Sequence, residues 1–188
     1  MRIAFLATTL PLALLAACGG PQESQANDAQ ANISMGQRVP ATATSTDLSA
    51  MTGAAVSKEE AKLAMHERHE SMEKIGKASK AVRRELESDT PNLGAIRQSA
   101  STIAEQSKYT ASQFPKGSGP DVGKTGAKPE IWANAQDFTA KTANFQQAAQ
   151  AFNQAAGGND IAAIKKSFAD LGGTCKACHD KYRAEMKH

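Results

Sequence analysis

The sequence predicts an all-α protein, an antiparallel four-helix bundle. Ala, Gln, Lys and Glu dominate its 188 residues, whereas aromatic residues make up only 5% and Val and Ile are too scattered to form a sheet. Four segments carry apolar or small residues at steps of three, four and seven, the period of a helix with one buried face. Two short connections and one longer one join these segments, which favours antiparallel neighbours.

The chain begins with a segment typical of bacterial export. One basic residue precedes an apolar run that is too short to cross a bilayer, so residues 1–17 are predicted to be a signal peptide that is removed. Residues 15–18, Leu-Ala-Ala-Cys, resemble a lipobox, in which the cysteine is lipidated. We therefore expect a lipid anchor on Cys18; the alternative is ordinary cleavage nearby that leaves a free thiol. Gly19, rather than Asp, after the cysteine favours the outer membrane.

Residues 18–56 are predicted to form a flexible tether. They are rich in Gln, Ala, Asn, Ser and Thr and show no sustained apolar period, so they cannot bury enough surface to order. A coil of this length would place the folded domain, residues 57–188, roughly 35 Å from the anchor on average. The formal net charge of +3 provides no strong field to select nucleic acid, which we therefore do not expect as a partner.

Caps and periodic residues predict the first two helices. Ser57 is the expected N-cap of the first, with Glu60 as its capping-box partner. Asp89 and Pro91 are expected to end it and to start a second helix that continues to Phe114. The inward positions of the first helix are Met65, Met72, Ile75, Ser79, Val82 and Leu86. Those of the second are Leu93, Ile96, Ala100, Ile103, Ser107 and Phe114.

The last two helices follow a long loop, residues 116–128. The third is predicted to open at Pro129 and to end at Gly157, and Asn159 or Asp160 is expected to cap the fourth. The inward positions of the third are Ile131, Ala135, Phe138, Thr142, Phe145, Ala149 and Phe152. Those of the fourth are Ile161, Ile164, Phe168, Leu171, Cys175, Cys178 and Tyr182, so both thiols are expected to face the bundle interior.

Residues 175–179, Cys-Lys-Ala-Cys-His, have the spacing of haem c attachment. Two thiols one helical turn apart can reach the two vinyl groups of the haem, and the adjacent imidazole can turn toward the iron. We therefore expect one covalent haem c near the C-terminal end of the last helix. Cys175 and Cys178 would attach it, and His179 would be an axial iron ligand.

Three other interpretations of residues 175–179 are possible, and each requires a further feature of the chain. A structural disulfide would strain a helix and would not need His179. A thioredoxin-like redox pair expects a strand before the helix, which the sequence does not predict. A zinc site needs two further ligands, which His66 and His69 could nominally supply.

In this arrangement the chain resembles the class II c-type cytochromes, the cytochrome c prime family. Members carry the haem motif near the C-terminus of a four-helix bundle, and the resemblance covers residues 59–187. It rests most specifically on residues 175–183, Cys-Lys-Ala-Cys-His-Asp-Lys-Tyr-Arg. Residues 128–132, Lys-Pro-Glu-Ile-Trp, and 68–72, Arg-His-Glu-Ser-Met, support it.

Met72 occupies the position at which members of this family differ. The resemblance implies that low-spin members use a methionine there as the sixth iron ligand, whereas high-spin, gas-binding members have a residue that cannot coordinate. We therefore expect Met72 to bind the iron, because a thioether stabilises ferrous iron and fills the site that a small gas would take. Core packing of Met72, ligation by Met65 and a bis-histidine haem with His69 are the alternatives.

Two arginines are expected near the haem. Arg68 lies one turn before Met72 on the buried side, where it needs an anion, and the haem propionates are the expected partner; a solvated Arg68 at the rim is the alternative. Arg183 lies four residues after His179 on the same helix face. The resemblance implies that an arginine there lies near the proximal histidine and screens it.

Together these residues predict a monohaem electron carrier and not an enzyme, because a fully ligated iron has no open position for chemistry. We expect it in the periplasm, held to a membrane by the lipid on Cys18, with periplasmic or membrane redox proteins as partners. A homodimer through the first two helices, as relatives often form, is left open. The alternatives are a high-spin protein that binds NO or CO and a helical lipoprotein stapled by zinc or a disulfide.

Overall fold

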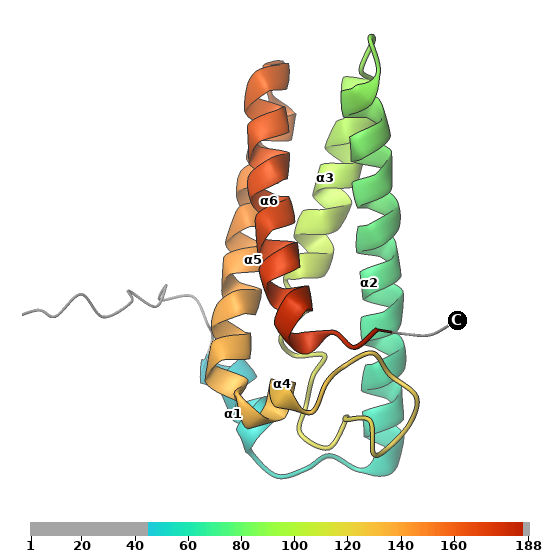
Figure 1. The fold of residues 1–188 in the computed structure, drawn as a ribbon, viewed down its shortest axis with the longest axis vertical. Coiled ribbons are helices and arrows are strands. Elements are labelled where there is room, and N and C mark those ends of the chain that lie inside the picture. Colours follow the sequence, from blue (N-terminus) through green and yellow to red (C-terminus); the bar gives the residue numbers. More distant parts are fainter. Residues whose placement is uncertain (1–44, 186–188) are drawn as a thin grey trace, which may run out of the picture. The chain divides into compact units, whose positions relative to one another are not determined.

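The computed structural model describes residues 45–185, in which four long helices and two short ones form a bundle (Figure 1). The long helices are α2 (Lys58–Glu87), α3 (Leu93–Ser107), α5 (Ala135–Gly157) and α6 (Ile161–Tyr182), and the short ones are α1 (Ser45–Thr52) and α4 (Glu130–Ala133). α2 packs against α3, α3 against α5, and α5 against α6, with alternating chain direction. The predicted all-α bundle is confirmed, since the described residues contain no strand and only one isolated bridge, between Ala127 and Arg183.

The N-terminal predictions fall largely outside the described residues. The signal peptide (1–17), the lipid site at Cys18 and residues 18–44 of the predicted tether all lie there. Among the described helices, none is long and apolar enough to span a membrane. The end of the predicted tether needs a correction, because residues 45–52 form α1 and Met51 is only 1% exposed. Its side chain is buried among residues distant in sequence, so local composition could not reveal this helix.

Two predicted helix starts are confirmed by their caps. The Ser57 hydroxyl accepts a hydrogen bond from the backbone N–H of Glu60 at 3.3 Å, and the Glu60 carboxylate accepts one from the backbone N–H of Ser57 at 2.9 Å. This reciprocal pair is the capping box expected for α2. At the start of α6 the Asp160 carboxylate accepts from two backbone N–H groups, those of Ala162 and Ala163, so Asp160 rather than Asn159 is the cap.

Three helix boundaries differ from the prediction. α3 begins after Asn92, whose side chain accepts from the backbone N–H of Ala95, and not at Asp89 and Pro91. It ends at Ser107, whereas the prediction continued it to Phe114 through residues that form turns. The predicted third helix is broken at Asn134 into α4 and α5. All seven of its predicted inward residues are nevertheless buried.

Two clusters of buried side chains form the interior. The main core joins α2, α3, α5 and α6 and contains Ile75, Ala78, Val82, Leu86, Ile96, Ala100, Ile103, Phe145, Ala149, Phe152, Ala156, Ile164 and Leu171. The end core contains Met51, Phe114, Ile131, Ala135, Phe138 and Tyr182. It lies where α1, α4 and the end of α6 meet (Figure 1). Its aromatic rings pack edge to face, with centroids 4.8 Å apart for Phe114 and Phe138 and 5.2 Å for Phe138 and Tyr182.

Candidate haem site

The two thiols of the haem motif lie on the inward side of α6, at the junction of the two cores. Cys175 packs against the main core and Cys178 against the end core. Both are half-buried and neither is in a disulfide. The expectation that the thiols face the interior is therefore met, and the disulfide interpretation is not supported.

Burial sets the protonation state of these thiols. It raises the pKa of Cys175, and it raises the pKa of Cys178 to about 11. A redox-active pair needs a lowered thiol pKa, and a thioredoxin-like site also needs a preceding strand, which the described residues lack. The thiols therefore have the character of half-buried, protonated groups and not of a dithiol redox centre.

His179 follows the second thiol at the surface of the last turn of α6. Loss of hydration lowers the pKa of its imidazole, and the positive charge of Arg183 lowers it further, against a smaller opposing effect of Asp180. The neutral imidazole, which is the form that binds iron, is therefore favoured near pH 7. The backbone N–H of Arg183 donates to the carbonyl of His179 at 3.0 Å, so this arginine is the C-cap of α6.

Met72 and Arg68 lie on α2, which runs antiparallel to α6 (Figure 1). Met72 is half-buried and packs against the main core, as Cys175 does. The guanidinium of Arg68 lies 4.9 Å from the centre of the Phe114 ring in the end core, against which Cys178 packs. Met72 and Cys175 thus share the main core, whereas Arg68 and Cys178 each lie against the end core, Arg68 through the Phe114 ring alone.

Arg68 is buried, with 4% exposure, among neutral partners. Its guanidinium donates to the hydroxyl and the carbonyl of Ser118, at 3.0 and 2.8 Å, and to the hydroxyl of Thr125 at 3.0 Å. Burial lowers its pKa to about 10, still far above neutrality, so the charge is retained. A solvated Arg68 at the rim is therefore ruled out. No local pattern could point to Ser118 and Thr125 as partners, because they lie 50 and 57 residues from Arg68 in an irregular loop.

The alternative ligands on α2 are less well placed. Met65 packs toward the loop, where its methyl carbon lies 3.2 Å from the position of a Cβ built on Gly123. His66 and His69 are exposed, and His69 faces Glu73 at 3.5 Å. Within residues 45–185 no three His, Cys, Asp or Glu side chains are grouped to hold a metal ion, so the zinc interpretation finds no donor set there.

Two charged residues near Cys178 were missed by the sequence analysis. Asp137 and Lys141 lie on α5, one turn apart, and the charges of both act on the Cys178 thiol. Asp137 also accepts hydrogen bonds from Lys181 and Tyr182 on α6. Their spacing of four residues, beginning next to inward-facing Phe138, was the only available signal.

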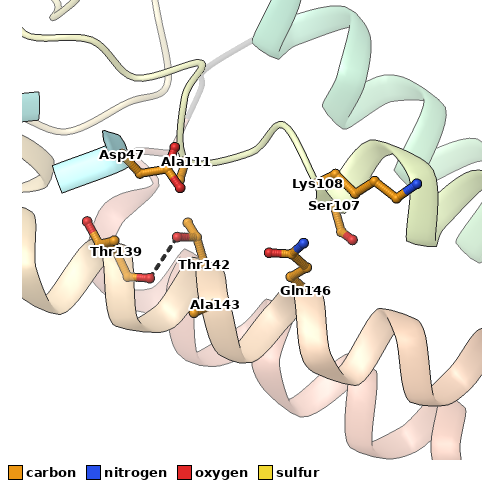
Figure 2. A pocket seen from close by; sticks show the side chains of 8 residues that line it. All are labelled: Asp47, Ser107, Lys108, Ala111, Thr139, Thr142, Ala143 and Gln146. Carbon is orange, nitrogen blue, oxygen red and sulfur yellow. Dashed lines mark hydrogen bonds between the residues drawn. The ribbon is translucent and has the colours of Figure 1, made fainter. Parts of the chain in front are cut away.

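A small hollow lies elsewhere in the bundle, between α1, the end of α3 and α5 (Figure 2). Its lining residues are Asp47, Ser107, Lys108, Ala111, Thr139, Thr142, Ala143 and Gln146. The Thr142 hydroxyl donates to the backbone carbonyl of Thr139 at 2.8 Å, so this hydroxyl is satisfied within its own helix. The volume of about 10 Å³ holds about one water molecule, and none of the predicted site residues lines it.

The residues on α6 fit a covalently attached haem. Two free thiols lie one turn apart on the inward side of the helix, and a largely neutral imidazole follows. Gly172 and Gly173 precede them, and apart from the adjoining residues and backbone of α6 itself no atom lies within 4 Å of a Cβ built at either position, which leaves open space beside the helix. A helical bundle with this motif at the end of its last helix defines the class of bundle-type c haem proteins.

Comparisons with known proteins give the family. A model of the cytochrome C' family matches residues 63–183. Cytochrome c' of Pararhodospirillum photometricum is 33% identical over 116 residues, which cover 62% of this chain and 92% of that protein. The structure of cytochrome c prime from Shewanella frigidimarina is 31% identical with a TM-score of 0.63, covering 68% of this chain and 98% of that one.

A third comparison involves a ligand complex. The nitric oxide complex of a mutant of cytochrome c prime from Alcaligenes xylosoxidans is 25% identical, with a TM-score of 0.59, and covers 67% of this chain and 97% of that one. The chain belongs to the cytochrome c' family and binds one covalently attached c-type haem.

Proposed function

We propose that this protein is a monohaem electron carrier and not an enzyme, in which Cys175 and Cys178 attach the haem and His179 and Met72 are the axial ligands. The position of Met72 supports this most. It lies on the helix that runs antiparallel to α6, and it packs against the same core as Cys175. A thioether here would occupy the sixth position and leave no open site for substrate.

The side chains around the haem would hold it without large rearrangement. The haem, when bound, supplies one-electron chemistry. Thioether bonds from Cys175 and Cys178 would fix its position on α6, and the main core behind Met72 and Cys175 would restrict movement between α2 and α6. A site that changes little on oxidation suits rapid electron exchange with a partner.

The two arginines are proposed to act through their positive charges, Arg68 on a haem propionate and Arg183 on the proximal imidazole. Arg68 is buried and charged, but its hydrogen bonds within the described residues go to neutral groups. A buried cation needs an anion, which supports a haem propionate as its further partner. Arg183 lowers the pKa of His179 through its charge, which supports a role in keeping the proximal imidazole neutral.

A second candidate function is binding of a small gas such as NO or CO. The nitric oxide complex of the Alcaligenes xylosoxidans mutant supports it, because that protein shares this fold. In this case Met72 would pack in the distal pocket without binding the iron, and the sixth position would be open.

Optical spectra of the haem-loaded protein distinguish the two functions. Oxidised and reduced spectra should be recorded with and without CO for the wild type, Met72→Ala and the control Met65→Ala. We expect low-spin spectra that do not respond to CO in the wild type and in Met65→Ala, and a high-spin, CO-reactive spectrum in Met72→Ala. A wild type that already binds CO would contradict the electron-carrier proposal and favour gas binding.

We further propose that the protein acts in the periplasm, anchored to the outer membrane through a lipid on Cys18, with periplasmic or membrane redox proteins as partners. The export-like N-terminus and the lipobox-like residues 15–18 support this. We also propose a homodimer through the first two long helices, α2 and α3; Leu63 on α2 and Tyr109 in the turns after α3 are exposed apolar side chains that such an interface could cover. Metabolic labelling with a fatty acid should mark the wild type and not Cys18→Ser. Sedimentation of the haem-loaded protein should give the mass of a dimer.

A further inference from the structure

A cluster of charges on α5 and α6 is centred on Asp137. The Tyr182 hydroxyl donates to Oδ2 of this carboxylate at 2.5 Å, and Lys181 Nζ donates to the same oxygen at 3.0 Å. Lys141 Nζ lies 3.7 Å from Oδ1, one turn farther along α5. The carboxylate is thus fixed by one hydroxyl and two ammonium groups.

This cluster lies beside Cys178. Tyr182 follows Cys178 by one helical turn, and both pack in the end core with Phe138, the neighbour of Asp137. The side chains of Lys141 and Asp137 are 27% and 43% exposed, so both are partly withdrawn from water. Burial alone would raise the pKa of Asp137, but the hydrogen bonds from Tyr182 and Lys181 and the two lysine charges outweigh it and lower the pKa. The carboxylate is therefore ionised near neutral pH.

We propose that Asp137 and Lys141 set the reduction potential of the haem by opposing effects. The proposal rests on attachment through Cys178 but not on ligation by Met72. Reduction transfers one electron from a redox partner, or from an added reductant in vitro, to the ferric iron and forms or breaks no bond. The site thereby becomes more negative by one charge. A nearby carboxylate opposes this change and a nearby ammonium favours it, and both effects are larger where water is partly excluded.

The midpoint potentials of haem-loaded variants test this proposal. Asp137→Asn should shift the potential upward and Lys141→Gln should shift it downward from the wild type. The double variant should return toward the wild-type value, because the two removed charges are opposite. Asp137→Asn is isosteric, and Lys141→Gln replaces the ammonium with a neutral, shorter polar side chain. A general disturbance of the fold does not predict shifts of opposite sign.

The Lys166–Asp170 pair on α6 is a matched control. It has the same residue types four positions apart, with 2.7 Å between Lys166 Nζ and Asp170 Oδ2, but the side chains are 77% and 62% exposed. Water and salt should screen these charges, so Asp170→Asn and Lys166→Gln should shift the potential less than their counterparts on α5.

Two results would overturn the proposal in distinguishable ways. Shifts of Asp137→Asn and Lys141→Gln that have the same sign, or that do not exceed those of the control pair, would show that these charges do not tune the haem. A haem bound in full to Cys178→Ala with the mass and absorption of two thioether bonds would show that Cys178 is not the attachment point, which would also remove the proposed site.

Discussion

Arg68 holds a positive charge where the protein shields it from most of the solvent, since only 4% of the residue is exposed. Its donors are matched to three acceptors on two residues of the long loop, and its flat guanidinium lies over an aromatic ring. A lysine has no comparable fork of donors, so arginine is the residue that can join α2 to this loop at several points at once. The same residue thus serves the fold and, in our proposal, the haem.

Substitution of Arg68 should reduce stability measurably. Arg68→Ala would leave the buried Ser118 hydroxyl and carbonyl without a donor, and we expect a loss of about 2 kcal/mol in the free energy of unfolding of the haem-loaded protein. Denaturant titration measures this free energy. The value for Arg68→Lys should lie between those of the wild type and Arg68→Ala. Arg84→Ala is the control, because that side chain is 75% exposed and should change stability by less than about 0.5 kcal/mol. Equal losses for Arg68→Ala and Arg84→Ala would contradict a structural role of Arg68.

At the scale of single helices, the start of α2 and the start of α6 are determined by residues next to them in the sequence. Each begins at a side chain that accepts hydrogen bonds from N–H groups that would otherwise be unpaired in the first turn. The break at Asn134 is different in kind. There α4 turns Ile131 and Trp132 toward the end core, and Trp132 Nε1 donates to the carbonyls of Phe114 and Pro115. That contact joins α4 to the segment after α3.

The cap of α2 should weaken in acid. Hydrogen bonds from Ser57 lower the pKa of Glu60 in the folded protein, so the carboxylate is favoured by folding. Its stabilising effect is therefore present above the unfolded pKa of about 4.3 and is lost as the pH falls through the lower folded value. Glu60→Ala should lower the melting temperature more at pH 7 than at pH 3. Glu67→Ala, in the middle of the same helix, should have a smaller effect at pH 7; equal effects would argue against the capping role.

At the scale of the whole molecule, α1 extends the end core beyond the residues that match the family. Met51 is buried there, and its sulfur lies 3.7 Å from the Thr139 hydroxyl, which donates its proton to the backbone carbonyl of Ala135 at 2.7 Å. The chain after α1 is also fixed to the loop, because the backbone N–H of Lys116 donates to Ala50 and that of Val56 donates to Lys116. The segment before α2 is thus part of the fold and not only a connection to the N-terminus.

Release of α1 should expose this segment without unfolding the bundle. Met51→Asp places a charge in the end core, and burial of a methionine is worth about 1.5–3 kcal/mol, so we expect α1 to detach. Hydrogen exchange should become faster in residues 45–52, while α5 and α6 stay protected. Ser49→Asp, at an exposed position of the same helix, is the control. Unchanged exchange in Met51→Asp would contradict the docking of α1.

The sequence by itself determined the class of fold, the inward residues of the last two helices and the haem motif. These are local properties. A helix repeats every 3.6 residues, so spacing fixes which side chains share a face. The haem motif at Cys175 and Cys178 can likewise be identified from adjacent residues alone. The same holds for the cap at Ser57, whereas at the start of α6 the sequence left Asn159 and Asp160 as alternatives and the structure shows Asp160 as the cap. Only the tertiary structure decided the environment of the site.

Three features depended on contacts between distant parts of the chain. The helix over residues 45–52, the neutral partners of Arg68 and the charges of Asp137 and Lys141 beside Cys178 had no periodic or spacing signal strong enough to predict them. Each arises because the bundle brings residues from different elements together in one partly dry region, where a single contact can stabilise a segment or fix a charge. Local sequence sets which residues face inward, and packing sets which of them meet.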